Sequence, residues 1–110
     1  MKGASVKLFM VLAILAAFAC VAHGLPFEWH QGLGNDIWAQ GCDFLGNDIR
    51  TVPMTHALSC GDTCRGYTGC NHWAWNRDQC FLKSADSVWI TDAVQYRGST
   101  YATCGLMNSL

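Results

Sequence analysis

Residues 55–83 read THALSCGDTCRGYTGCNHWAWNRDQCFLK, and this stretch contains four of the cysteines of the chain. Residues 55–67 predict a short helix, with Thr55 as a candidate N-cap. On such a helix Cys60 and Cys64 share one face. Cβ atoms four residues apart lie about 5 to 6 Å from each other, whereas a disulfide needs about 3.5 to 4.5 Å. Each of the two must therefore pair with a cysteine elsewhere.

The residues after this helix predict a β-hairpin. Residues 70–75 read as a strand that places Trp73 and Trp75 on one face, and residues 80–83 read as its partner across a polar turn. One or two further strands are expected among residues 87–90, 94–97 and 100–104. Short strands around a single helix indicate an α+β fold.

The N-terminal segment has the features of a secretory leader. Lys2 and Lys7 precede an apolar run over residues 8–22, and small residues follow, which predicts a signal peptide over residues 1–24. The run has 15 residues, whereas a membrane-spanning helix needs about 20. Cleavage removes Cys20 and leaves an even set of cysteines: Cys42, Cys60, Cys64, Cys70, Cys80 and Cys104. An even set in a short secreted chain predicts a disulfide framework.

The charge of the predicted mature chain disfavours two classes of partner. After residue 24 the chain has five basic and eight acidic residues, a net charge of −3. This balance gives no basic patch for nucleic acid. No second apolar stretch follows the leader, so no membrane contact is expected after cleavage.

The mature chain is expected to have three parts. Residues 25–40 read as an extended N-terminal arm, residues 41–106 as the domain, and residues 107–110 as a tail. The tetrapeptide GNDI occurs at residues 34–37 and again at residues 46–49. Because Gly and Asn tolerate positive φ and Asp caps the backbone locally, the two copies predict two similar turns.

Four elements in this order resemble the PAN/apple domain family. They are the run over residues 43–52, the helix with Cys60-x3-Cys64, the strand with Cys70-x2-Trp73-x-Trp75, and the strand with Cys80-x-Leu82-Lys83. The resemblance covers residues 41–105. It implies a curled antiparallel sheet that cradles the helix, with Cys60 bridged to Cys80 and Cys64 bridged to Cys70.

The third bridge is less closely specified by this resemblance. The two implied bridges leave Cys42 to join Cys104. In the apple subgroup, however, the cysteine that pairs with the last one usually lies further upstream than Cys42. The alternatives for Cys42 are a free thiol and an intermolecular bridge.

Metal binding and catalysis are both disfavoured. A zinc site from His56, His72 and the cysteines is not expected, because thiols engaged in disulfides cannot ligate a metal. Asp43, Asp48 and Asp62 are not placed in any acid–base motif, and no nucleophile elbow occurs. Carboxylates beside Gly and Asn are typical of turn caps. We therefore expect no enzymatic activity and no cofactor.

The five tryptophans are more than a small core can hold. Trp73 and Trp75 are expected to pack against the helix. Trp29, Trp38 and Trp89 lie in segments that the fold constrains less, so at least one of them is expected to be exposed. The alternative for these residues is packing beneath the N-terminal arm.

The sequence thus predicts a secreted, non-enzymatic module that binds an extracellular ligand. The expected ligand-binding residues are Trp38, Trp89, Lys83 and Arg97. Abundant tryptophan with few basic residues favours a neutral polysaccharide or cell-wall glycan over a heparin-like polymer. The alternative is a protein–protein interaction module in adhesion, in a matrix or with a protease, because exposed aromatic side chains also form protein hot spots. Self-association would supply avidity in either case.

Overall fold

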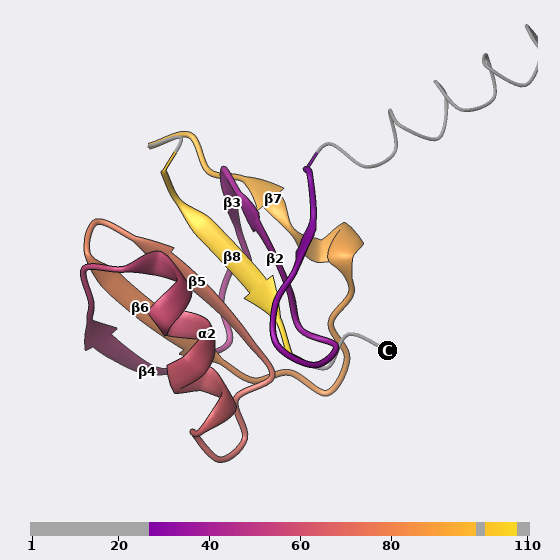
Figure 1. Ribbon diagram of the computed structural model, residues 1–110, viewed down its shortest axis with the longest axis vertical. Coiled ribbons are helices and arrows are strands. Elements are labelled where there is room, and N and C mark those ends of the chain that lie inside the picture. The colour runs from indigo at the N-terminus through magenta and orange to yellow at the C-terminus, as the bar shows by residue number, and fades with distance from the viewer. Residues whose placement is uncertain (1–26, 99–100, 108–110) are drawn as a thin grey trace, which may run out of the picture.

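An antiparallel sheet forms the centre of the molecule. In the computed structural model, which describes residues 27–98 and 101–107, this sheet has six strands (Figure 1). Their spatial order is β1 (His30–Gln31), β2 (Ile37–Gln40), β8 (Thr103–Leu106), β5 (His72–Asn76), β6 (Gln79–Lys83) and β4 (Asp48–Pro53). The predicted signal peptide and residues 108–110 of the predicted tail lie outside the described residues.

Smaller elements cover both faces of this sheet. Helix α2 (Ala57–Arg65) contacts β5, β6 and β8 on one side, which we call the helix face. The ribbon of β3 (Cys42–Asp43) and β7 (Val94–Gln95), with the 3₁₀ helix η1 (Ile90–Asp92), covers the opposite side, the ribbon face (Figure 1). The predicted α+β class is therefore confirmed. Within the described residues, no helix has the length and apolar character needed to cross a membrane.

Strand β5 shows how the two faces are divided. Trp73 packs on the helix face with Cys60 and Cys64, whereas the next residue, Ala74, packs on the ribbon face with Phe44. The period of two along the strand produces this alternation. Trp73 is 2% exposed, which confirms the prediction that it belongs to the core.

Trp75 packs on the same face as Trp73 but is only partly buried. Its indole Nε1 donates a hydrogen bond of 2.7 Å to the carbonyl oxygen of Met54. The buried part of this indole therefore has a partner for its polar atom, as buried tryptophans usually do.

Three disulfides join the helix and the ribbon to the sheet. They link Cys60 to Cys80, Cys64 to Cys70, and Cys42 to Cys104. The first two fasten α2 to β6 and to the residues before β5, which is the wiring that the family resemblance implies. The third fastens the ribbon to β8, so Cys42 is neither free nor bonded to another molecule. All of these sulfurs are therefore withdrawn from metal binding.

The helix is shorter at both ends than the sequence predicts. It begins at Ala57 with His56 as N-cap, not at Thr55, and it ends at Arg65. At its start, Met54 N donates to the carbonyl oxygen of Asp78 in the β5–β6 turn at 2.8 Å. This bond holds the preceding residues against the hairpin and delays the first helical turn.

The predicted N-terminal arm is corrected by the structure. Residues 30–31 and 37–40 are strands β1 and β2 of the same sheet, and β2 pairs along its length with β8. A tight turn joins β1 to β2, with Gly34 at φ +62° and a hydrogen bond of 2.7 Å from Gly32 N to the carbonyl oxygen of Asp36. Two-residue strands such as β1 are too short to show a period in the sequence.

Both copies of the GNDI tetrapeptide bend the chain, but they are not the two similar turns that the sequence predicts: residues 34–35 form a turn, whereas Gly46 lies at a bend and Asn47 also has a positive φ. Gly34 and Gly46 have positive φ in the two copies. The aspartates that follow do more than cap the backbone locally, because Asp36 forms an ion pair with Arg65 of α2 and Asp48 forms one with Lys83 of β6. Each copy is thereby tied to a neighbouring element.

The C-terminal part contains two further strands, in agreement with the one or two that the sequence predicts. Residues 87–90 do not form a strand, residues 94–95 form β7, and residues 103–106 form β8. In the first segment Trp89 N donates to a carboxylate oxygen of Asp92 at 2.8 Å, and Asp92 N donates to the carbonyl oxygen of Trp89 at 2.9 Å. This reciprocal pair closes a 3₁₀ turn and excludes an extended conformation.

Candidate ligand-binding cleft

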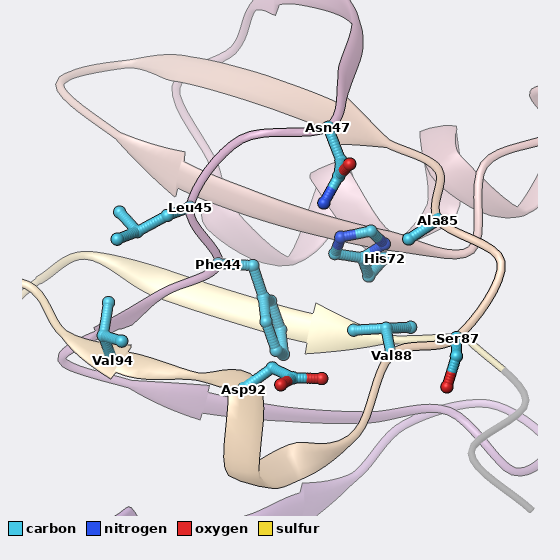
Figure 2. Close-up of a pocket in the computed structure, with 9 residues that line it drawn as sticks. All are labelled: Phe44, Leu45, Asn47, His72, Ala85, Ser87, Val88, Asp92 and Val94. Carbon is cyan, nitrogen blue, oxygen red and sulfur yellow. The ribbon is translucent and has the colours of Figure 1, made fainter.

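A cleft of about 290 Å³ opens on the ribbon face. We call it the His72 cleft. Its apolar walls come from Phe44, Leu45, Val88 and Val94, and its polar side chains are Asn47, His72, Ser87 and Asp92 (Figure 2). These residues come from the β3–β4 loop, from the start of β5, from the segment between β6 and β7, and from the start of β7. The cleft is thus assembled from parts that are distant in the sequence.

The β3–β4 loop brings one wall into place. Phe44 follows β3 directly, and Gly46 and Asn47 both have positive φ, which turns the chain toward β4. The carbonyl oxygen of Asn47 accepts a hydrogen bond of 3.0 Å from Ser84 N after β6. This bond ties the loop to the segment that forms the opposite wall.

The floor of the cleft consists of two rings. His72 and Phe44 are 1% and 2% exposed, and their ring centroids lie 5.2 Å apart at right angles (Figure 2). Burial, followed by the positive charge of Lys83, lowers the pKa of His72 to about 4. The imidazole is therefore neutral at the pH of most extracellular fluids.

Lys83 corrects one of the predicted ligand-binding residues. It is 3% exposed, and its Nζ donates to the carbonyl oxygen of Gly46 at 2.9 Å and forms an ion pair with Asp48. The ammonium group is therefore engaged inside the fold and is not available to a ligand. Nearby, burial raises the pKa of the half-buried Asp43, although the charge of Lys83 opposes this shift.

The four predicted ligand-binding residues do not form one site. Trp89 is 66% exposed, follows Val88 of the cleft in sequence, and donates through its backbone N to Asp92 of the lining. Trp38 stacks on His30 at 4.5 Å and packs against the core of the helix face. Arg97 is exposed beyond β7. Only Trp89 is therefore placed beside the His72 cleft.

A second hollow lies on the helix face, between α2 and the β1–β2 turn. It measures about 250 Å³ and includes Trp38, Leu33, Leu58 and Arg65 in its lining. Arg65 bridges the carboxylates of Asp36 and Asp62 across this hollow. Trp29, the remaining tryptophan, is partly buried against the core of the ribbon face, in agreement with the alternative of packing.

Several cleft residues carried no signal in the sequence. The sequence predicts a turn at Asn47, and no pattern in it predicts a binding role for Phe44, Ser87 or Asp92. Their common feature is a position in loops that long-range strand pairing, of β3 with β7 and of β4 with β6, brings together.

No comparison with protein-family models and none with curated protein sequences gives a match to this chain.

The buried imidazole leads to a prediction about acid stability. Because the fold lowers the pKa of His72 from 6.5 to about 4, the unfolded chain binds a proton in this interval that the folded chain does not. Above pH 6.5 His72 is neutral in both states and does not lower the free energy of unfolding. As the pH decreases from 6.5 to 4, protonation of the unfolded chain lowers the free energy of unfolding, and the loss reaches about 3 kcal/mol at pH 4 and below. Urea unfolding at pH 7.5 and pH 4.5 measures this loss.

Two variants separate this effect from the titration of carboxylates. His72→Phe removes the titrating ring and should lose less stability between the two pH values than the wild type. His56→Phe changes an exposed histidine and should show the wild-type loss. An equal loss in both variants would contradict the role of His72.

Proposed function

We propose that the protein is a secreted, non-enzymatic module that binds a neutral extracellular carbohydrate in the His72 cleft. The observation that carries this proposal is the composition of the cleft. Apolar walls lie beside hydrogen-bonding side chains, among which Asp92 is the charged one, and no unpaired cationic side chain lines the cleft in the described part of the chain.

The apolar and polar parts of the cleft suit the two kinds of surface on a sugar. Phe44 and Val88 offer surfaces for the C–H groups of a pyranose ring, and Asn47, Ser87 and Asp92 offer hydrogen bonds to hydroxyl groups. Small-molecule sites in general combine an apolar lining with a few convergent polar groups. The volume of about 290 Å³ is close to the lower end of the range for small-molecule sites, about 300 to 1,000 Å³.

The charges around the cleft disfavour acidic glycans. His72 is neutral because its pKa is lowered to about 4, and Lys83 is neutralised by Asp48. Asp92 is the charged side chain that remains in the lining. Sulfated or carboxylated sugars would meet a carboxylate there instead of a cation, and the net charge of −3 after residue 24 adds to this repulsion.

We further propose that this module is of the PAN/apple type. The support is the position of α2 on one face of an antiparallel sheet, together with the bridges from Cys60 to Cys80 and from Cys64 to Cys70. Secretion is supported by the three disulfides, since such bonds form and persist in oxidising compartments.

One observation favours protein binding as a second candidate. Leu45 and Val94 in the lining of the cleft are 69% and 38% exposed, and Trp89, which is bonded through its backbone to Asp92 of the same lining, is 66% exposed. Exposed apolar side chains that gather on one surface mark interaction sites in many soluble proteins. A partner protein would cover these side chains, whereas a small sugar would cover only part of them.

Trp89→Ala is expected to weaken glycan binding about tenfold without affecting the fold, because it removes an exposed aromatic ring beside the cleft. A glycan array identifies the ligand, and calorimetric titration then measures the affinity of the wild type and the variant. Leu33→Ala is the matched control, since Leu33 is 67% exposed and lies at the hollow on the helix face.

Three measurements test the proposal of a neutral carbohydrate ligand. Leu33→Ala should bind as the wild type does, and both variants should unfold within about 0.5 kcal/mol of the wild type. Affinity should change little between low and physiological salt, because the proposed ligand is uncharged. Failure to bind any arrayed glycan would reject the carbohydrate proposal, and a steep salt dependence would reject a neutral ligand.

A further inference from the structure

The orientation of the His72 ring is fixed by Asn71. The side-chain Nδ2 of Asn71 donates to the carbonyl oxygen of Ala85 at 2.6 Å, and its Oδ1 accepts from Ala85 N at 3.2 Å. These two bonds leave Oδ1 as the acceptor of the amide. His72 Nδ1 lies 2.7 Å from the same Oδ1, so Nδ1 must carry the proton that it donates.

The second ring nitrogen of His72 is therefore an unprotonated acceptor. The neutral imidazole has one N–H, which is at Nδ1, so Nε2 presents a lone pair. Among the described residues no hydrogen bond involves Nε2, although every fully buried side-chain nitrogen and oxygen there has a partner. Nε2 is thus reached from the cleft, and Figure 2 shows one ring nitrogen on the side of Asn47 and the other toward Ala85.

The neighbouring charges leave Nε2 in this state. Lys83 of β6 opposes protonation of the ring, whereas Asp92 of η1 and, to a smaller extent, Asp48 of β4 favour it. Burial outweighs both carboxylates, and the pKa of about 4 keeps the lone pair free at neutral pH.

Asp92 supplies a second acceptor to the cleft. One of its carboxylate oxygens accepts from Trp89 N at 2.8 Å, which holds the side chain in place in the cleft lining (Figure 2). A carboxylate can accept about four hydrogen bonds, so this contact leaves most of its capacity for a ligand. His72 Nε2 and the Asp92 carboxylate can therefore accept hydrogen bonds from a ligand, and neither group can donate one to it.

We propose that one hydroxyl group of the bound sugar donates a hydrogen bond to His72 Nε2 and that a second donates to Asp92. The cleft thereby selects sugars with free hydroxyl groups at two positions over the same sugars with these groups methylated. This inference rests on the proposed function, since it names the chemistry by which the same cleft recognises its ligand.

The preference for free over methylated sugars arises because a methylated sugar would leave both acceptors of the cleft without a hydrogen-bond donor. A methylated sugar cannot donate, and it would bury Nε2 and the Asp92 carboxylate against carbon. A buried acceptor that loses its partner costs more than the hydrogen bond itself contributes. Sites that hydrogen-bond a substrate hydroxyl therefore reject analogues that lack it by large factors.

The tautomer can be tested without any ligand. ¹⁵N nuclear magnetic resonance of the histidine side chains at pH 7 should show His72 with a protonated Nδ1 and an unprotonated Nε2. A protonated Nε2 at this pH would overturn the inference. His56 in the same spectrum provides an exposed histidine for comparison.

Ligand selectivity is tested with defined probes on the same labelled protein. The probes are the methyl glycosides of glucose, galactose, mannose and N-acetylglucosamine, each beside its fully O-methylated counterpart. The glycoside that binds should shift the Nε2 resonance of His72 and leave Nδ1 protonated, and its O-methylated form should bind at least about 100-fold more weakly.

Two variants add an independent measurement. His72→Phe keeps a buried ring but removes the acceptor, and Asp92→Asn keeps an acceptor for Trp89 N but removes the charge. Each should reduce the affinity for the binding glycoside about tenfold. His56→Phe should leave the affinity unchanged. Unfolding curves at pH 7.5 show whether His72→Phe is folded, and Asp92→Asn serves as the test if it is not.

The outcomes separate this inference from the proposed function. If a glycoside binds but its O-methylated form binds equally well, or if Nε2 does not respond, the inference is wrong and the carbohydrate proposal stands. If neither the probes nor any arrayed glycan binds, both are wrong.

Discussion

Gly105→Ala is expected to destabilise the domain by about 3 kcal/mol or more, although it adds a single methyl group. A Cβ at residue 105 would lie 2.4 Å from the indole of Trp73, and a Cβ at Gly61 of α2 would lie 3.3 Å from the same indole. The ring is thus held between the helix and β8 with no room to move away. Urea unfolding followed by tryptophan fluorescence measures the loss.

The matched control is Gly66→Ala. Gly66 has a φ of −88°, and a Cβ there would come no closer than 3.9 Å to any neighbouring atom. This variant should unfold within about 0.5 kcal/mol of the wild type. An equal loss at both positions would show that the indole can relax, and would contradict the packing described here.

A double variant identifies the origin of the strain. Trp73→Ala alone should cost about 3 to 5 kcal/mol, because it leaves a cavity in the core. In the absence of the indole, the methyl group of Gly105→Ala has nothing to clash with. The combined loss should therefore be smaller than the sum of the two single losses, as expected for residues in direct contact.

The parts of the fold that the sequence predicts depend on local patterns. The hairpin of β5 and β6 follows from alternation over a few residues, and the burial of Trp73 follows from its place on that strand. The two disulfides of α2 have the cysteine pairing that the family resemblance implies. Such features need no knowledge of distant parts of the chain.

The remaining parts depend on contacts between distant residues. The sequence predicts Lys83 as a ligand-binding residue, but Asp48, which pairs with it in the structure, lies 35 residues earlier in the chain. Strands β1 and β2 were read as an arm because their partner, β8, lies at the other end of the domain. The His72 cleft combines segments from both halves, so no local pattern marks it.

Removing the bridge from Cys42 to Cys104 is expected to cost more stability than removing either of the other two. Its cysteines are 62 residues apart in sequence, compared with 20 for the bridge from Cys60 to Cys80 and 6 for that from Cys64 to Cys70. The loop-closure entropy restored to the unfolded chain corresponds to about 4, 3 and 2 kcal/mol in that order. A small domain has about 5 to 15 kcal/mol of stability in total, so the longest bridge contributes a large share of it.

Paired Cys→Ala variants at each bridge, unfolded in urea at pH 7.5, measure this order. The variant without the bridge from Cys64 to Cys70 is the internal control, because it loses two buried or partly buried sulfurs but only a short loop. Equal losses at the three bridges would indicate that packing of the sulfurs, not chain entropy, determines the effect. The expected order would mean instead that the attachment of the ribbon to β8, and with it the position of Phe44 in the His72 cleft, depends mainly on this one covalent bond.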